Sequence, residues 1–301
     1  MTRRGTGLFI CFILFQSVIY GIGNPLTKVA YESITPLWLL VVRYGMALVL
    51  LALLFGRRIV ACLRRTDWRL WLPSGFCCAG AFVAINVALS LTEATSVGFL
   101  MSLSVLFAPI LSALYLRRPY DRRSLPIQLV LVVGLFLLCC NGGAFSFGAG
   151  EALSLFAALC LAGILVFGER AMAEMDAVSF TAPQMAITFV VSLVGALLFE
   201  PTTGLTGSQP EAWLVAVYLA VVCSVGGNLL QNSAVLHLSA STVSMLQCTQ
   251  PILTAAASFF MLGEVLSDLG FVGAVIIVAG LLLDGWLHRD RSGDDAPAAS
   301  Q

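Results

Sequence analysis

Apolar residues fill this chain in ten stretches of about twenty positions, separated by short polar or charged connections. A helix needs roughly 20 mostly apolar residues to cross the hydrocarbon core of a bilayer, which is about 30 Å thick. The pattern therefore predicts ten membrane-spanning helices. We expect them at residues 7–29, 36–56, 70–90, 95–116, 125–141, 151–170, 179–199, 211–235, 240–262 and 269–287.

The second half of the chain repeats the first at an offset of 146 residues. At this offset Gly80 meets Gly226, and Asn86, inside a predicted span, meets Asn232. Each half holds five spans, an odd number, so the two halves must cross the membrane in opposite directions. The sequence therefore predicts an all-α integral membrane protein whose ten transmembrane helices form an inverted 5+5 repeat, an arrangement typical of secondary transporters.

The repeat also predicts the domain limits. Residues 1–145 and 146–287 are expected to be the first and the second five-helix repeat. Residues 288–301 are polar and charged and have little apolar surface to bury, so we expect a disordered cytoplasmic tail.

Composition and charge narrow the class of protein. The chain is 59% hydrophobic and 11% charged, whereas soluble domains carry about 25% charged residues. The net charge is zero, which argues against nucleic acid as a partner. The nine cysteines show no metal-ligand or redox spacing, so no metal site and no cofactor is expected. The expected partners are the lipid bilayer and a small-molecule substrate.

The distribution of basic residues predicts the orientation. Lys and Arg are enriched in cytoplasmic loops of membrane proteins. Arginines gather at residues 3–4, 57–69 and 117–123, which places the N-terminus and the connections after the second and fourth spans in the cytoplasm. Ten spans return the C-terminus to the same side. The protein is thus expected to be a multi-pass plasma-membrane protein with both termini cytoplasmic.

Four short patterns together resemble a known family. The first span ends YGIGNPLTKVA, and a Pro–x6–Arg pattern follows at Pro36 and Arg43. The fourth span contains SLSVLFAPILSALYL, and the ninth contains Pro251 followed by Leu-Gly-Glu ending at Glu264. In these patterns the chain resembles the drug/metabolite transporter superfamily, specifically the EamA-type ten-helix permeases. The resemblance implies transport of amino acids or other small metabolites.

The chain departs from that family pattern in its first half. Val105 stands where the family usually has proline, with Pro109 displaced by one turn, and Arg117–Arg118 occupy the Gly-Glu position. The two halves have therefore diverged, and we expect them to play unequal roles.

Polar residues inside spans are costly in hydrocarbon and mark a transport pathway by default. Four of them share one face of the first span, at spacings of three, four and four: Ser17, Tyr20, Asn24 and Lys28. Pro25 removes a backbone donor and is expected to break this helix. In the other interpretation, the proline only kinks the helix and Lys28 reaches to the membrane interface.

Arg43 is the one arginine well inside a span. Because its guanidinium stays protonated and offers five donors, it requires acceptors nearby. Two interpretations remain open: Arg43 contacts a substrate carboxylate or a gate, or it pairs structurally with an acid such as Glu169.

Amide and hydroxyl side chains gather in the eighth and ninth spans. Because amides both donate and accept, they suit a zwitterion or a polyol. We expect them to line a cavity, with interhelical hydrogen bonding as the alternative. Asn86 is included in the pathway, although a symmetric structural contact with the second half is the other interpretation. The remaining pathway candidates are Ser224, Asn228, Gln231, Gln247 and Gln250.

These features predict a secondary transporter of small polar metabolites, amino acids or related compounds, that works by alternating access, with export as the expected direction. The alternative is a facilitative channel-like protein or an exchanger for drug-like or lipid-like compounds. The spans hold no paired acids and no nucleophile–base pair, so no enzyme activity and no catalytic residue is expected.

Overall fold

The computed structural model describes residues 3–92, 94–117, 125–139, 148–202, 209–262 and 267–294. Every regular element within these ranges is a helix. Seven of the helical stretches are long and apolar enough to cross a membrane, and α6 and α13 contribute shorter apolar segments. The predicted all-α membrane fold is confirmed. Arg118, Gly263 and Glu264, which entered the sequence analysis, lie outside the described residues, as do residues 140–141 of the fifth predicted span.

The helices follow the ten predicted spans closely. The first half contains α1 (Arg3–Tyr31), α2 (Pro36–Leu63), α3 (Trp68–Leu91), α4 (Ala94–Ser102), α5 (Ser104–Tyr115) and α6 (Leu125–Cys139). The second half contains α7 (Ala149–Ala171), α8 (Ala177–Phe199), α9 (Pro210–Tyr218), the π-helix η2 (Leu219–Gly227), α10 (Asn228–Val235), α11 (Ala240–Gln247), α12 (Gln250–Leu262) and α13 (Asp268–Asp294).

Local sequence signals explain where several helices begin. Pro36 and Pro210 occupy the first turn of α2 and α9, where the missing N–H costs no hydrogen bond. The carboxylate of Asp176 accepts hydrogen bonds from the N–H groups of Val178 and Ser179 and so caps α8. The hydroxyl of Ser239 caps α11 in the same way.

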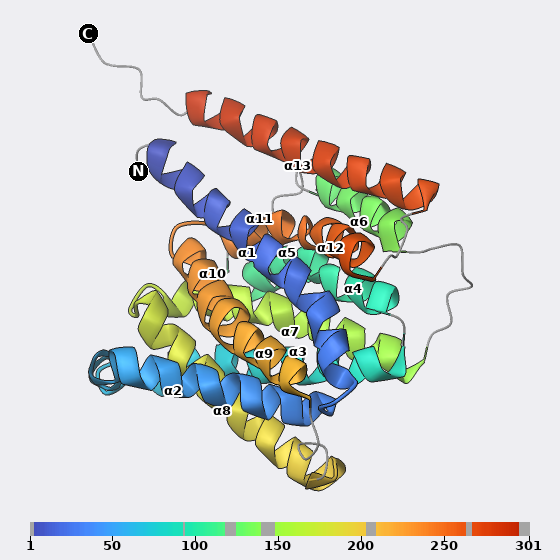
Figure 1. Ribbon diagram of the computed structural model, residues 1–301. Helices are drawn as coiled ribbons and strands as arrows, with labels where there is room; N and C mark the ends of the chain where they lie inside the picture. The colour runs from blue at the N-terminus through green and yellow to red at the C-terminus, as the bar shows by residue number, and fades with distance from the viewer. Residues whose placement is uncertain are drawn as a thin grey trace.

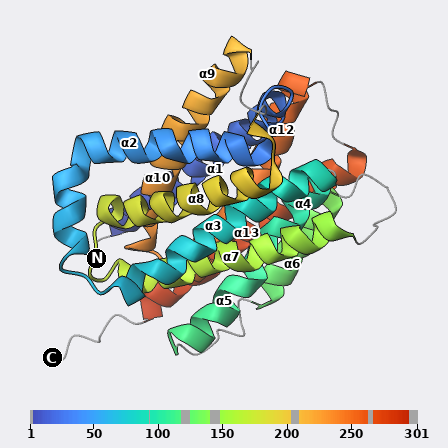
Figure 2. The same cartoon turned by 90° about the horizontal axis from the view of Figure 1, so that it is seen from below.

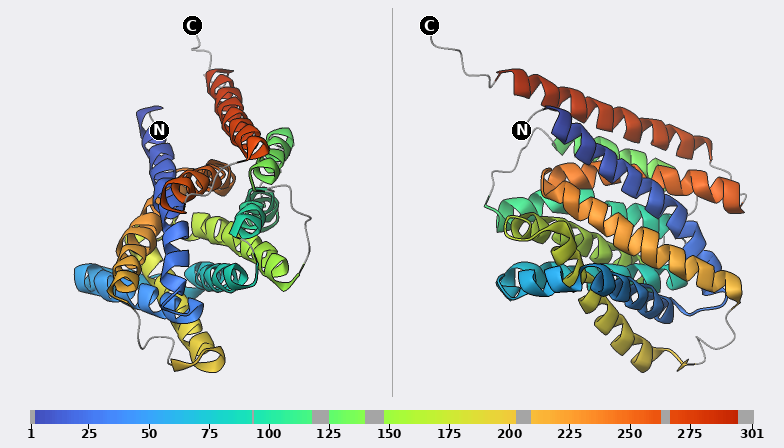
Figure 3. Two further views of the ribbon diagram at one scale, coloured as in Figure 1. Left: turned by 45° about the vertical axis from the view of Figure 1, so that its right-hand side comes forward. Right: turned by 60° about the vertical axis from the view of Figure 1, so that its left-hand side comes forward.

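Repeat-equivalent helices pack against each other at two places. Both α2 with α8 and α6 with α13 lie 146 residues apart in the chain and side by side in space (Figures 1 and 2). Figure 3 shows α6 and α13 together at the margin of the bundle, with the first turns of α1 and the last turns of α13 toward the same end. The α6–α13 contact depends on glycines. A Cβ atom on Gly134 would lie 2.8 Å from Cγ1 of Ile277.

Two of the spans are broken, and they break at equivalent positions. Span four is interrupted at Leu103, between α4 and α5, and span nine at Cys248 and Thr249, between α11 and α12. Leu103 and Thr249 are 146 residues apart. In span nine Pro251 cannot donate to the carbonyl of Gln247, which explains the break.

The break in span four has a different local cause, since Val105 replaces the proline. Here the hydroxyl of Ser102 donates to the carbonyl of Gly98 at 2.7 Å and competes with the helical ladder. The N–H of Leu103 then bonds to the carbonyl of Leu100, three residues back, at 3.2 Å.

Two expectations from the sequence are wrong. Pro25 lies inside the continuous helix α1, so it does not break the first span. One proline can be accommodated within a helix when neighbouring groups satisfy the freed carbonyl. The second error concerns the tail, because α13 continues to Asp294 and residues 288–294 are helical. Residues 295–301 lie outside the described residues.

Candidate functional site

A cavity lies within the bundle, between the two repeats, and both halves contribute to its walls. Its volume is about 900 Å³, including its opening to solvent. The lining residues come from α1, α2, α3, α7, α10 and the two broken spans. They are Gln16, Tyr20, Asn24, Thr27, Arg43, Phe82, Ile85, Asn86, Leu89, Met101, Ser102, Ser104, Leu161, Ile164, Asn228, Gln231, Ser244, Gln247, Cys248 and Gln250.

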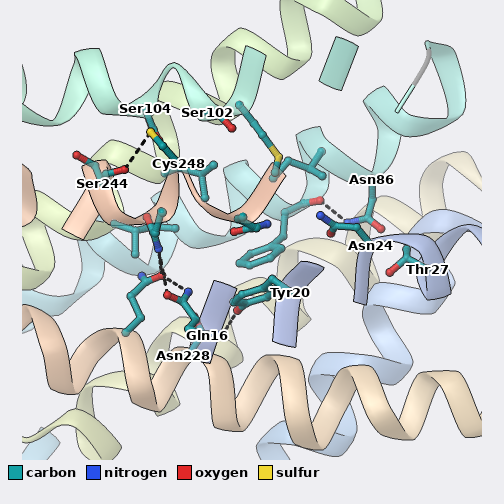
Figure 4. A pocket seen from close by; sticks show the side chains of 18 of the residues that line it. Gln16, Tyr20, Asn24, Thr27, Asn86, Ser102, Ser104, Asn228, Ser244 and Cys248 are labelled. Atoms are coloured by element: carbon teal, nitrogen blue, oxygen red, sulfur yellow. Dashed lines mark hydrogen bonds between the residues drawn. The ribbon is translucent and has the colours of Figure 1, made fainter. Parts of the chain in front are cut away.

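One face of α1 runs along the cavity (Figure 4). Tyr20 packs closely over Gly227, where an added Cβ atom would lie 3.0 Å from the tyrosine ring. The hydroxyl of Tyr20 accepts a hydrogen bond from the amide of Asn228 at 3.1 Å. Farther along the helix, the amide nitrogen of Asn24 donates to the hydroxyl of Thr254 at 3.3 Å. The α1 face therefore connects the first repeat to α10 and α12 of the second.

Arg43 is the one charged side chain among the described residues that line the cavity. It is buried, and its Nε donates to the hydroxyl of Ser224 at 2.6 Å. The centre of the guanidinium lies 5.4 Å from the ring centroids of both Tyr44 and Phe82. Its Nη2 is buried without a hydrogen-bond partner among the described residues. Among the described residues no ion pair joins Arg43 to Glu169, whose carboxylate accepts a hydrogen bond from the N–H of Ala240 at the start of α11.

The position of Ser224 depends on the π-helix. Residues Leu219–Gly227 form a π-helical segment between α9 and α10, and Ser224 lies within it. Segments of π-helix occur frequently at functional sites, since the extra residue per turn changes the direction of neighbouring side chains. The equivalent stretch of α3 is regular α-helix. The π-helix is therefore specific to the second half, where it holds the hydroxyl that orients Arg43.

Three glutamines form a closed hydrogen-bonded triad at the cavity wall. The amide nitrogens of Gln16 and Gln247 both donate to Oε1 of Gln231, each at 2.8 Å. The amide nitrogen of Gln247 is also 3.3 Å from Oε1 of Gln16. This glutamine triad joins α1 of the first repeat to α10 and α11 of the second.

Both helix breaks open onto the cavity. Figure 4 shows Ser102, Ser104 and Cys248 on the side opposite Tyr20 and Asn228. The lining residues on either side of one break are the repeat equivalents of those on either side of the other: Met101 with Gln247, Ser102 with Cys248, and Ser104 with Gln250.

The two halves line the cavity with different chemistry. At three equivalent pairs of positions the first half has an apolar residue and the second half an amide: Phe82 and Asn228, Ile85 and Gln231, Met101 and Gln247. We refer to Phe82, Ile85 and Met101 as the apolar wall and to Asn228, Gln231 and Gln247 as the amide wall; the first half adds the amides of Gln16, Asn24 and Asn86 to the cavity. Such a cavity suits a small molecule with one apolar and one polar side.

The structure brings most of the predicted pathway residues together. The cavity is lined by Tyr20, Asn24, Arg43, Asn86, Asn228, Gln231, Gln247 and Gln250. Ser17 is buried and Lys28 half-buried, and neither lines the cavity. Ser224 supports the site through Arg43 without lining it.

Asn86 and its repeat equivalent Asn232 occupy different environments. Asn86 lines the cavity and accepts a short hydrogen bond from the hydroxyl of Tyr31. Asn232 lies away from the cavity, and its amide donates to Thr181 and Gln184 of α8 at 2.8 Å and 2.9 Å. The two asparagines do not contact each other in a symmetric pair.

Sequence reasoning missed several lining residues, among them Gln16, Thr27, Ser102 and Ser104. Gln16 precedes Tyr20 by four positions and Asn24 by eight, so the face used to select Ser17 also pointed to Gln16. The apolar wall carried no such signal, because Phe82 and Ile85 look like any lipid-facing residues in a sequence.

Comparison with known proteins gives consistent results. The model of the EamA-like transporter family matches residues 7–140 and again residues 148–284. An uncharacterized transporter of Archaeoglobus fulgidus is 24% identical over 271 residues, which cover 89% of this chain and 82% of that protein. A second uncharacterized transporter of the same organism is 23% identical over 264 residues, covering 85% of this chain and 90% of that protein. A solved crystal structure superposes with a TM-score of 0.80 at 17% identity, covering 96% of this chain and 99% of the other, and so shares the fold.

Proposed function

The chain belongs to the EamA-like transporter family, and from this premise we propose that it is a secondary carrier for small polar metabolites that works by alternating access. The compounds in question are amino acids or related molecules that bear a carboxylate. The substrate occupies the cavity between the repeats, contacts the amide wall and the apolar wall, and faces Arg43.

The observation that carries the proposal is the pair of helix breaks. Leu103 and Thr249 interrupt spans four and nine at equivalent positions, and both breaks border the cavity. Discontinuous helices at the interface of inverted repeats are a common way to build a midplane substrate site. Rocking of one repeat against the other then exposes the same cavity to either side of the membrane in turn.

The interactions between the repeats support this mechanism. The glutamine triad and the Asn24–Thr254 hydrogen bond join side chains of the two halves across the cavity. Interhelical hydrogen bonds of this kind are worth only about 0.6 kcal/mol on average in membranes. They are weak enough to break and re-form during a transport cycle.

The experiment that tests the proposal is uptake into liposomes that contain the purified protein. A pooled panel of labelled amino acids, hydroxy acids, nucleosides and sugars is offered with and without a pH gradient. We expect saturable uptake of at least one class. Asn228→Ala removes an amide from the cavity wall and is expected to reduce this uptake.

Asn232→Ala is the matched control, since it removes the same side chain one turn farther along α10 and away from the cavity. It is expected to lower thermal stability, because its partners Thr181 and Gln184 lose a bond, while the folded protein retains uptake. Failure of the well-folded protein to take up any compound would contradict the proposal. Equal loss of uptake in both variants would contradict the choice of site.

A further inference from the structure

The cavity has an uncompensated positive charge. Arg43 lines it, cannot release its proton and uses one hydrogen bond, from Nε to Ser224, to hold its position. Its Nη2 is buried and has no acceptor within the part of the chain that the structure describes. A buried charge strongly destabilises a fold when no opposite charge or acceptor lies beside it. The described residues offer Arg43 no carboxylate, so its charge favours the binding of an anion in the cavity.

The surroundings of Arg43 strengthen its interaction with a small anion. The rings of Tyr44 and Phe82 flank the guanidinium at 5.4 Å and keep its environment apolar. In such an environment a charge-assisted hydrogen bond between guanidinium and carboxylate is stronger than a neutral one. One arginine balances one negative charge, so a dianion such as phosphate would leave a net negative charge in the cavity.

An ammonium group meets no carboxylate in the same cavity, since no aspartate or glutamate occurs among the described residues that line it. The oxygen of Gln231 already accepts two hydrogen bonds within the glutamine triad, and the oxygen of Asn86 accepts one from Tyr31. An ammonium group needs three acceptors. The remaining amides, such as those of Asn24 and Gln250, are neutral and suit a hydroxyl group equally well.

From these observations we infer that the cavity binds a small organic monoanion, a carboxylate with neutral polar groups such as a 2-hydroxy acid, and that it discriminates against the ammonium group of an amino acid. The inference rests on the proposed function and narrows its substrate class. The carboxylate binds to Arg43, the hydroxyl group to the amide wall, and the carbon chain to the apolar wall formed by Phe82, Ile85 and Met101.

The test compares three series of compounds with the same carbon skeletons and different charge. These are 2-hydroxy acids, 2-amino acids and 2-hydroxy amides with three to six carbon atoms. Binding to the purified full-length protein is measured by thermal shift over a concentration series, and uptake is measured in liposomes. We expect the hydroxy acids to bind at least about tenfold more tightly than the matched amino acids and amides, as a charge-assisted pair implies.

Variants at Ser224 test the role of the charge without removing the arginine. Ser224→Asp places a carboxylate where the hydroxyl now meets Nε of Arg43 at 2.6 Å. It is expected to pair with Arg43, raise thermal stability and abolish the preference for hydroxy acids. Ser224→Asn has a similar size and no charge, and it is expected to keep the preference. Arg43→Gln is expected to lose it, and Arg43→Lys to keep part of it.

Each outcome of these experiments either supports or overturns the inferred preference for a monoanion. Preference for the hydroxy acids that disappears in Ser224→Asp and persists in Ser224→Asn supports it. Equal or tighter binding of the amino acids or amides overturns it, as does failure of all three series to bind. Uptake of amino acids, nucleosides or sugars without uptake of hydroxy acids would overturn this inference and leave the proposed carrier function standing, whereas absence of all uptake would contradict both.

Discussion

The two repeats share an architecture but not a chemistry. Their helices break at equivalent positions, Leu103 and Thr249, and equivalent residues on both sides of the breaks face one cavity. Yet Arg43, the charge in that cavity, has Phe189 as its equivalent in the second half. Three cavity amides of the second half likewise have apolar residues as their equivalents in the first half. A duplicated scaffold can thus keep its helix breaks at equivalent positions while equivalent residues around the cavity differ in charge and polarity.

The largest effect is expected from making the first half resemble the second at Arg43. Arg43→Phe introduces the residue found at the equivalent position, Phe189, and removes the charge from the cavity. A hydrogen bond to a charged group is worth about 1.5–3 kcal/mol, so transport efficiency should fall by roughly tenfold to a hundredfold. The measurement is kcat/KM for uptake in liposomes. Uptake at the wild-type rate by correctly folded Arg43→Phe would show that the charge is not part of the site.

The glycines at the α6–α13 contact should differ in their tolerance of a methyl group. A Cβ atom on Gly134 would lie 2.8 Å from Cγ1 of Ile277 and 3.0 Å from a backbone oxygen, whereas on its equivalent Gly280 it would lie 3.1 Å from the flexible end of Leu131. Overpacking of this kind costs about 1–3 kcal/mol. Thermal unfolding should therefore show Gly134→Ala to be the less stable variant.

Gly7→Ala is the control for this pair, because a Cβ atom there would meet nothing within 4 Å. Equal stability of Gly134→Ala and Gly280→Ala would mean that the close approach of α6 and α13 at Gly134 is not present in the membrane.

A smaller effect is expected from making the amide wall resemble the apolar wall. Gln247→Met introduces the residue of its equivalent, Met101, and removes one donor from the glutamine triad. Membrane hydrogen bonds are worth about 0.6 kcal/mol on average and at most about 1.7, so transport efficiency should fall roughly threefold, and at most about twentyfold.

The reverse change, Met101→Gln, is the matched comparison for this prediction. It adds an amide to the apolar wall, and it should weaken the uptake of substrates with longer carbon chains more than that of short ones. Identical substrate profiles for the two variants would contradict the assignment of separate apolar and amide walls.

The smallest effect concerns Asp176, which begins α8 outside the membrane spans and contacts Arg58 of α2 at 3.2 Å. Burial acts to raise the pKa of Asp176, but hydrogen bonds from Ser179 and the charge of Arg58 outweigh it, so the pKa lies below its ordinary value. A lowered pKa stabilises the fold above the unfolded-state pKa of about 3.9, and this contribution is lost as the pH falls through the folded-state value.

Asp176→Asn keeps one oxygen for the helix cap, removes the charge and replaces the oxygen that accepts from the hydroxyl of Ser179. Because Arg58 is largely exposed, the loss of stability at neutral pH should be below about 1 kcal/mol. The difference between wild type and variant should vanish at acidic pH. A difference that stays constant from pH 7 to pH 3 would show that the carboxylate charge is not responsible.

The sequence predicted the fold well because the main constraints are local. Span length and hydropathy fixed the ten helical segments, and the 146-residue offset identified the repeat. The positions of the helix breaks were harder to predict from the sequence. Pro25 is a stronger helix-breaking signal than Leu103, yet α1 stays continuous and span four is interrupted. What decides between these outcomes is the packing around each segment, which a single sequence does not contain.

Of the candidate site, mainly polar and charged residues were predicted from the sequence. Polar residues inside spans attract attention because their burial is costly, and Arg43, Asn228 and Gln247 were found in this way. The apolar wall could not be predicted from the sequence, since apolar side chains are equally stable against lipid and in a cavity wall. Lys28 met the same polar criterion and does not line the cavity, because it lies near the end of α1.

The most direct test of alternating access is two-sided labelling of one position in the cavity. Ser104→Cys, in a background without the nine native cysteines, is reconstituted in liposomes and exposed to a membrane-impermeant thiol reagent from the outside or from the inside. Alternating access predicts labelling from either side, with a transported hydroxy acid slowing both reactions, and the same behaviour for the equivalent variant, Gln250→Cys. Labelling of both positions from one side only, whatever the substrate, would contradict it.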